Sequence, residues 1–188
     1  MMSSFEDILR TVGSEVQEVL QNVNTAALAY AAEQLNSGRR MFVMGEGRSG
    51  LAGKMFAMRL MHGGYDVYAA GETITPAIQE NDLLIVLSGS GKTPGLVHAA
   101  EKAVDSGASL LVFTTDPGSP LGKLSEGNVK IPAATKYRRE EEPDTIQPLG
   151  NQFDQSLHLM LDALIIYAQE QNGSEDNDAF FARHSNLE

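Results

Sequence analysis

The run with the clearest chemical character consists of small hydroxyl and glycine residues, Ser88-Gly89-Ser90-Gly91-Lys92-Thr93, between an apolar segment and Pro94. Glycines let the backbone come close to an oxyanion, and the serine and threonine hydroxyls can donate hydrogen bonds to it. Thr93 followed by Pro94 predicts the start of a helix, whose free N–H groups attract anions. Turn and cap formation is the alternative use of these hydroxyls. We interpret the run as a phosphate-binding loop.

The Gly-Lys-Thr within this run is not an ATPase loop. A Walker motif requires a glycine five residues before its final Gly-Lys. Val86 occupies that position and lies inside the apolar segment. The nucleotide-hydrolysing class is therefore excluded for this loop.

A second glycine-rich run, Gly45-Glu46-Gly47-Arg48-Ser49-Gly50, follows another apolar segment. Read alone, it matches the dinucleotide-binding fingerprint, with Glu72 near the place of a ribose-binding acid. That alternative predicts an NAD-dependent oxidoreductase. The serine-rich loop indicates a small phosphorylated ligand instead, because a dinucleotide site needs only the first loop.

The elements that must position both loops alternate between strand and helix. We expect strands at 39–44, 65–69, 82–87, 109–114 and 128–132, and helices at 51–61, 95–105 and 121–125. A last, long helix is expected to follow the run 147–154 and to end at about residue 171. Near-continuous apolar strands alternating with helices are typical of a doubly wound parallel sheet. In a sheet of order 2-1-3-4-5, the strands before the two loops are neighbours, so the loops would face one crevice.

We therefore predict one three-layer α/β domain over residues 1–188, with a five-stranded parallel sheet of order 2-1-3-4-5. Residues 1–38 form an N-terminal helical segment, in which apolar residues recur at helical spacing over 4–37. Residues 39–171 form the α/β core. The tail, 172–188, is expected to dock on the core or on a neighbouring subunit. The mixed-charge run 134–143 is interpreted as a solvated connection rather than a ligand-binding loop.

Composition narrows the classes of partner. The chain has no cysteine and a formal net charge of −11, with 14 basic against 25 acidic residues. Thiol catalysis and zinc–thiolate sites are excluded, and an acidic chain argues against nucleic acid or an anionic membrane as its partner. The N-terminus lacks the pattern of a secretory signal, so we expect a cytoplasmic protein.

Taken together, Gly-x-Gly-x-Ser after the first strand and Ser-Gly-Ser-Gly-x-Thr after the third resemble the sugar isomerase (SIS) domain family. Further motifs are similar to those of its 6-phospho-3-hexuloisomerase members, and the likeness covers the whole chain. These motifs are Phe56-Ala57-Met58-Arg59-Leu60-Met61-His62, Gly71-Glu72-Thr73-x-Thr75-Pro76, Gln147-Pro148-Leu149-Gly150, and Ala182-Arg183-His184 with Asn186-Leu187-Glu188.

The resemblance implies interconversion of D-arabino-3-hexulose 6-phosphate and D-fructose 6-phosphate, a step of formaldehyde fixation by the ribulose monophosphate pathway. It also implies a homotetramer that needs no cofactor or metal and has active sites at subunit interfaces. Ser49, Ser88, Ser90 and Thr93 would hold the phosphate, and Asp154 and His62 would lie near the sugar carbons. Further candidates for the substrate site are Gly47, Arg48, Arg59, Gly89, Gly91, Lys92 and His184.

This reaction moves a proton between adjacent carbons through an enediol, which one carboxylate or imidazole can do while a cation stabilises the developing charge. Asp154 is the candidate base, with His62 as its partner or as the group that opens the sugar ring, and Arg48 or Arg59 is the candidate cation. Family members usually carry Glu at the position of Asp154. The structural alternative is that Asn151 caps a helix and Asp154 completes a capping box.

Two other functions stay open at this point. A non-catalytic sensor of sugar phosphates would use the same loop without turnover. An isomerase of another phosphosugar would use the same chemistry on a different carbon skeleton.

Overall fold

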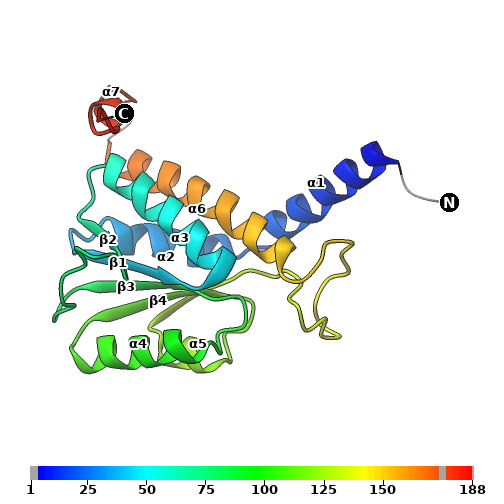
Figure 1. The fold of residues 1–188 in the computed structure, drawn as a ribbon, viewed down its shortest axis with the longest axis horizontal. Coiled ribbons are helices and arrows are strands. Elements are labelled where there is room, and N and C mark those ends of the chain that lie inside the picture. Colours follow the sequence, from blue (N-terminus) through cyan, green and yellow to red (C-terminus); the bar gives the residue numbers. More distant parts are fainter. Residues whose placement is uncertain (1–3, 174–176, 188) are drawn as a thin grey trace.

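The computed structural model contains a twisted parallel sheet between two layers of helices (Figure 1). It describes residues 4–173 and 177–187, so the predicted segments at 1–3, 174–176 and 188 lie outside the described residues. The strands are β1 (Met41–Gly45), β2 (Val67–Ala69), β3 (Leu83–Leu87), β4 (Ser109–Thr114) and β5 (Gly127–Lys130), in the order β2-β1-β3-β4-β5. This confirms the predicted sheet, and each strand end lies within two residues of its expected position.

Seven helices lie in the described part of the chain: α1 (Phe5–Gln21), α2 (Thr25–Leu35), α3 (Gly47–His62), α4 (Pro94–Asp105), α5 (Pro120–Leu124), α6 (Asn151–Gln171) and α7 (Asn177–Ala182). Figure 1 shows α2, α3 and α6 on one side of the sheet and α4 and α5 on the other. In the part of the chain that the structure describes, no helix combines the length and the apolar character needed to cross a bilayer.

The central strand β3 is covered by helices on both faces of the sheet, and its five residues are all buried. Alternate side chains of a strand point to opposite faces of the sheet. Leu83, Ile85 and Leu87 belong to the core shared with α3 and α6, whereas Leu84 and Val86 belong to the core beneath α4 and α5. A strand buried on both faces reads as a continuous apolar run, which is why the sequence located it.

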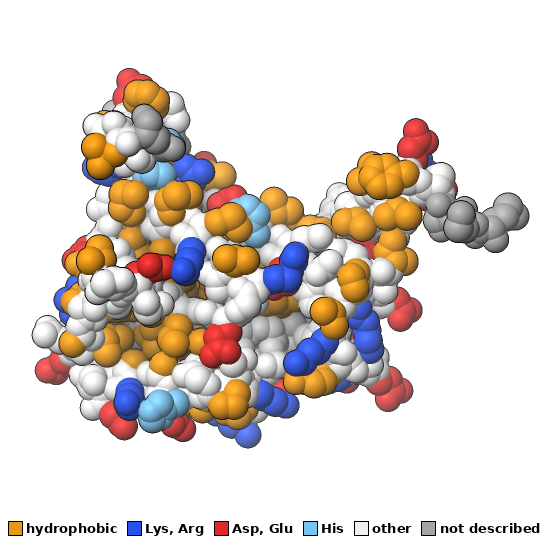
Figure 2. Space-filling view, in the orientation of Figure 1, with side chains coloured by type: hydrophobic (Ala, Val, Ile, Leu, Met, Phe, Trp, Pro, Cys, Tyr) orange, Lys and Arg blue, Asp and Glu red, His pale blue; other side chains and the backbone are white. Residues whose placement is uncertain are grey.

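The N-terminal segment differs from the single helical stretch expected at 4–37. It breaks at residues 22–24, where the side chain of Asn24 accepts hydrogen bonds from the amides of Ala26 and Ala27 and starts α2. The first half of α1 projects beyond the domain and exposes Phe5, Ile8 and Leu9 (Figures 1 and 2). Its second half buries Val16 and Val19.

At the edge of the sheet where β1 and β3 begin, Arg40 and Asp82 form an ion pair. The guanidinium donates to both carboxylate oxygens, at 3.0 and 2.6 Å, and the amide of Gln79 donates to the same carboxylate at 2.7 Å. The hydrogen bonds from Arg40 hold the pKa of Asp82 below its ordinary value of 3.8. This pair therefore stabilises the folded state most when Asp82 is ionised.

We expect Asp82→Asn to lower the free energy of unfolding at neutral pH by about 2 kcal/mol, because the variant leaves Arg40 without its carboxylate. The folded pKa is depressed, so the stabilisation is full above the ordinary pKa of 3.8 and is lost as the pH falls through the lower folded value. Urea unfolding at a series of pH values checks this. The deficit should shrink in acid, and the exposed control Asp105→Asn should show none; a deficit that is constant with pH would contradict the assignment.

Candidate functional site

The predicted phosphate loop lies where β3 ends and α4 begins, at the carboxyl edge of the sheet. Its turn closes on Gly91, whose amide donates to the carbonyl and the hydroxyl of Ser88 at 3.1 and 3.2 Å. Ser88 is 3% exposed, so its hydroxyl shapes the loop from inside. Ser90 lies one residue further on, and its hydroxyl accepts from the amide of Lys92 at 3.2 Å.

The segment after β4 holds this loop from behind. The carbonyl of Gly89 accepts hydrogen bonds from the hydroxyls of Thr114 and Thr115, at 3.2 and 2.8 Å, and from the amide of Thr115 at 3.1 Å. The carbonyl of Gly91 accepts from the amide of Leu121 at 3.2 Å. These bonds tie the carbonyls of the loop to the body of the protein.

The first glycine-rich loop is shorter than expected, because α3 begins at Gly47 and not near residue 51. A β-carbon on Gly50 would lie 2.6 Å from the carbonyl oxygen of Gly45, so only glycine allows this approach of helix to strand. Glycine there serves helix–strand packing. As a result, Arg48 and Ser49 lie in the first turn of α3.

Residues from both loops line one cavity of about 180 Å³. Ser49 comes from the first loop, Gly89 and Ser90 come from the second, and the start of α6 supplies Phe153 and Asp154. The other lining residues are Thr135, Lys136, Tyr137, Leu149 and Gly150. Hydroxyls, a glycine backbone and a carboxylate therefore meet in one small cavity, beside the apolar side chains of Leu149 and Phe153.

Asp154 links α6 to α3 at this cavity. Its carboxylate accepts from Arg48 Nε at 2.8 Å and from the Ser49 hydroxyl at 3.1 Å, and it is 13% exposed. The capping-box alternative is wrong, because Gly150 occupies the N-cap position of α6 and the carboxylate of Asp154 reaches α3 instead. A second hollow of about 260 Å³, next to Arg48 and Met55, shares Asp154 with the first.

The run 134–143 contributes more than the solvated connection that we expected. Thr135, Lys136 and Tyr137 line the cavity, although no sequence motif marked them. Only the position of the run could have indicated this role from the sequence. The run follows the last strand of the parallel sheet, so it begins at the same edge of the sheet as the two glycine-rich loops. The next segment is anchored by Glu15 of α1, which accepts from the Thr145 hydroxyl at 2.6 Å.

Of the six residues in the predicted phosphate loop, Gly89 and Ser90 line the cavity, whereas Ser88, Gly91, Lys92 and Thr93 do not. Lys92 pairs with Asp116, at 3.4 Å between ammonium and carboxylate. Thr93 is the N-cap of α4, as expected, and within the described chain its side chain makes no capping hydrogen bond. Glu72, the acid of the dinucleotide alternative, pairs with Lys54.

His62 lies at the other end of α3 from Ser49, about 20 Å away at the helical rise per residue. It is 4% exposed, and its ring stacks on His184 at 5.3 Å between centroids. Burial lowers the pKa of His62 below its ordinary 6.5, and the charge of Arg59 and the neighbouring His184 lower it further. The structure therefore does not bring His62, Arg59 or His184 to Asp154 within one chain.

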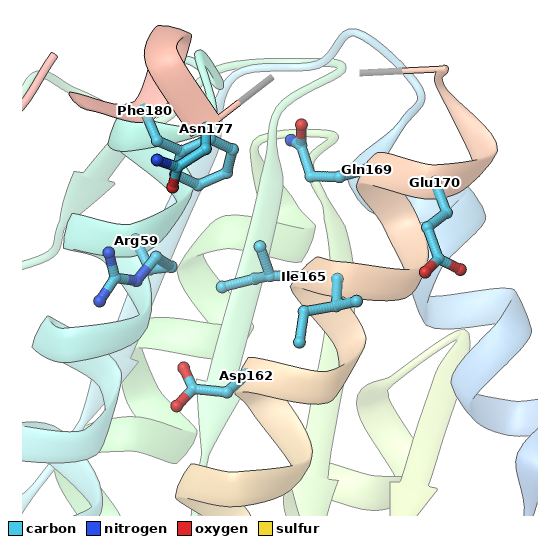
Figure 3. Close-up of a pocket in the computed structure, with 8 residues that line it drawn as sticks. Arg59, Asp162, Ile165, Gln169, Glu170, Asn177 and Phe180 are labelled. Carbon is cyan, nitrogen blue, oxygen red and sulfur yellow. The ribbon is translucent and has the colours of Figure 1, made fainter. Parts of the chain in front are cut away.

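A larger hollow, of about 600 Å³, lies near that far end between α3, α6 and α7 (Figure 3). Figure 3 shows Arg59 on α3 facing the α6 side chains Asp162 and Ile165, with Asn177 and Phe180 of α7 above them. Its lining contains no part of either glycine-rich loop. In the described part of the chain, no group of three or more histidine and acidic side chains is placed to hold a metal ion.

Comparison with known proteins gives consistent matches. The family model described as "SIS domain" matches residues 34–145. The 3-hexulose-6-phosphate isomerase of Mycobacterium gastri is 42% identical over 180 residues, covering 96% of this chain and 89% of the relative. The 3-hexulose-6-phosphate isomerase of Bacillus subtilis is 37% identical over 180 residues, covering 92% and 97%.

A solved structure has the same fold. It is the crystal structure of a hypothetical protein of Methanococcus jannaschii, from which a molecular function of 3-hexulose-6-phosphate isomerase was inferred. The two structures superpose with a TM-score of 0.83 at 26% identity. The match covers 96% of this chain and 98% of that one.

We expect Gly91→Ala to destabilise the protein by about 2 kcal/mol or more, because Gly91 has φ +62° and a β-carbon there would lie 1.9 Å from the Ser119 hydroxyl. The matched control is Gly13→Ala in α1, where a β-carbon meets nothing within 4 Å and alanine should be neutral or slightly stabilising. Thermal and urea unfolding compare the two. Equal stabilities would show that the loop tolerates a side chain at Gly91.

Proposed function

The chain belongs to the SIS domain family, and we propose that it is a sugar phosphate isomerase that interconverts D-arabino-3-hexulose 6-phosphate and D-fructose 6-phosphate. One observation carries the proposal: the Asp154 carboxylate and the serine–glycine loop line the same cavity. A phosphate in the loop would place the sugar carbons beside a carboxylate. The relatives named above support the choice of substrate.

The phosphate end of the substrate fits the loop. Ser90 and Ser49 present hydroxyls at the cavity, and the backbone of Gly89 lies beside them. The amino end of α4 follows immediately, so its dipole adds a favourable field for an anion. Because the chain is acidic overall, this binding depends on such local groups.

Asp154 performs the proton transfer in this proposal. Its carboxylate removes the proton from C2 of the 3-ketose, the C3 carbonyl becomes an enediolate oxygen, and the proton returns to C3 as the carbonyl forms at C2. The hydroxyl proton of O2 moves to O3, so atoms and charges balance. Arg48, which now donates to Asp154 at 2.8 Å, stabilises the enediolate once the substrate lies between them.

The site is completed by a second subunit in a homotetramer that uses no cofactor. His62 is about 20 Å along α3 from Ser49, so it can act on a sugar only at a neighbour's cavity. Exposed apolar side chains support such an interface, since monomers rarely expose large apolar patches. On α3 and α6 these are Leu51, Met55, Met58, Met61, Leu159 and Ile166, and on the projecting part of α1 they are Phe5, Ile8 and Leu9 (Figure 2).

The activity is tested by generating D-arabino-3-hexulose 6-phosphate in situ from formaldehyde and ribulose 5-phosphate and following D-fructose 6-phosphate with coupled enzymes. We expect wild-type turnover, a fall in kcat of about a hundredfold or more in Asp154→Asn, and an unchanged rate in the exposed control Asp105→Asn. Asp154→Glu should keep measurable activity, since it keeps the carboxylate.

Two outcomes would contradict the proposal. Turnover that survives Asp154→Asn would remove Asp154 as the base. A wild type that binds sugar phosphates without converting them would favour the non-catalytic sensor.

We expect Met58→Glu to dissociate the assembly and to lower activity, because a buried charge at an apolar contact has no compensating partner. Sedimentation velocity and the coupled assay, run on the same samples, measure both effects. Val104→Glu on α4 is the matched control, since Val104 is also exposed but lies on the opposite side of the sheet. A monomeric wild type with full activity would refute the shared site.

A further inference from the structure

We propose that Lys136 binds the phosphate of the substrate and that Glu142 is the residue that positions it. The inference rests on the proposed function, and it assigns a role to a run that the sequence motifs leave out. Two observations support the inference. Other cations near the cavity already form ion pairs with carboxylates, and hydrogen bonds to Glu142 and from Arg138 fix the run 135–142.

The cations around the cavity differ in their partners. Arg48 is paired with Asp154 and Lys92 is paired with Asp116. Lys136 lines the cavity itself, and none of the ion pairs within 4.0 Å among residues 4–173 and 177–187 involves its ammonium group. Its ammonium lies 5.2 Å from the centre of the Tyr137 ring, a contact that leaves its hydrogen-bond donors available. Lys136 is therefore the lining cation whose charge is not already committed to a carboxylate.

The two residues that flank Lys136 are fixed by one buried carboxylate. Glu142 accepts from the Thr135 amide at 2.8 Å and from the Thr135 hydroxyl at 2.6 Å, and the Thr135 hydroxyl in turn accepts from the Tyr137 amide at 3.2 Å. The Glu142 side chain is 6% exposed. Burial alone would raise its pKa, but the hydrogen bonds from Thr135, with help from Arg139, outweigh this and hold the pKa below 4.5. Glu142 is thus ionised at neutral pH. It holds Thr135 directly and Tyr137 through the Thr135 hydroxyl, so it restrains the backbone on both sides of Lys136.

Arg138 connects this run to the start of α6. Its guanidinium donates to the carbonyl of Thr135 at 2.6 Å and to that of Leu149 at 3.0 Å, and it also donates to the carbonyl of Gln147. Leu149 stands five residues before Asp154 on the same segment. The segments that carry Lys136 and Asp154 are therefore joined through Arg138, and both residues line the same cavity.

Lysine suits an anion rather than the proton transfer. Its ammonium is a compact charge with three donors on a flexible chain, and it meets phosphate oxygens without the planar geometry that arginine requires. The chain has a net charge of −11, and salt screens charges that lie more than about 8 Å apart. A lysine without an ion-pair partner at the cavity therefore attracts an anion mainly at short range.

The experiment compares steady-state kinetics of Lys136→Gln, Lys136→Arg and the exposed control Lys102→Gln with the wild type at low and high salt. We expect Lys136→Gln to raise KM about tenfold with little change in kcat, and to flatten the rise of KM with salt. Lys136→Arg should keep most of the affinity, and Lys102→Gln, which makes the same charge change on α4, should behave as wild type. An unchanged KM in Lys136→Gln would overturn the assignment.

The positioning role is tested by a double-mutant cycle. Glu142→Gln alone should raise KM by a factor similar to that of Lys136→Gln, and it should add less than about twofold in the Lys136→Gln background. Full additivity would overturn the positioning role. If Glu142→Gln does not fold, Thr135→Val takes its place in the cycle and is read in the same way.

A wild type without turnover would refute the proposed function but not this inference. Calorimetric titration with D-fructose 6-phosphate and with D-fructose then decides. A loss of affinity in Lys136→Gln for the phosphorylated sugar alone supports the role of Lys136. Equal affinities of the wild type and Lys136→Gln for D-fructose 6-phosphate overturn it.

Discussion

The parallel pairing of β1 with β3 is the constraint on which the site depends. In register, Gly45 at the end of β1 faces Leu87 at the end of β3, so the two glycine-rich loops begin side by side. Both strands are buried by helices on the two faces of the sheet, which fixes their register because a slip by one residue would turn apolar side chains to the wrong face. The close contact of Gly45 with Gly50 then starts α3 against the sheet and aims its first turn at α6.

The charges of the site follow from this geometry. The helices α3 and α6 pack side by side with their first turns together (Figure 1), so Arg48 and Ser49 reach Asp154. The anion-binding groups approach the same space from the loop after β3, and the run after β5 closes it on a third side. In the proposed function, the acidic protein binds an anion here because the helix ends, hydroxyls and one lysine gather within a small volume, where local contacts outweigh the net charge.

The elements that the sequence predicted well are those set by local pattern: buried strands as apolar runs, and α4 by Thr93 and Pro94. The break before α2 was missed although Asn24 is a common capping residue, since the apolar spacing continues through it. The run at 135–142 could not be located from local pattern, because its bonds, such as those of Arg138 to Gln147 and Leu149, join loops without periodicity. The motif residue His62 was predicted for the site, but the structure places it at the other end of α3 from Ser49.

The bonds that Thr114, Thr115 and Leu121 make to the carbonyls of Gly89 and Gly91 have a thermodynamic consequence for ligand binding. Backbone torsions that are already fixed lose little conformational entropy when an anion arrives, so in the proposed function the phosphate meets a preorganised loop. The loop's share of the affinity would be the same for every phosphorylated sugar, because the proposed contacts are only to the group that these sugars share. Discrimination between carbon skeletons would therefore fall to the other residues of the cavity lining, such as Phe153 of α6.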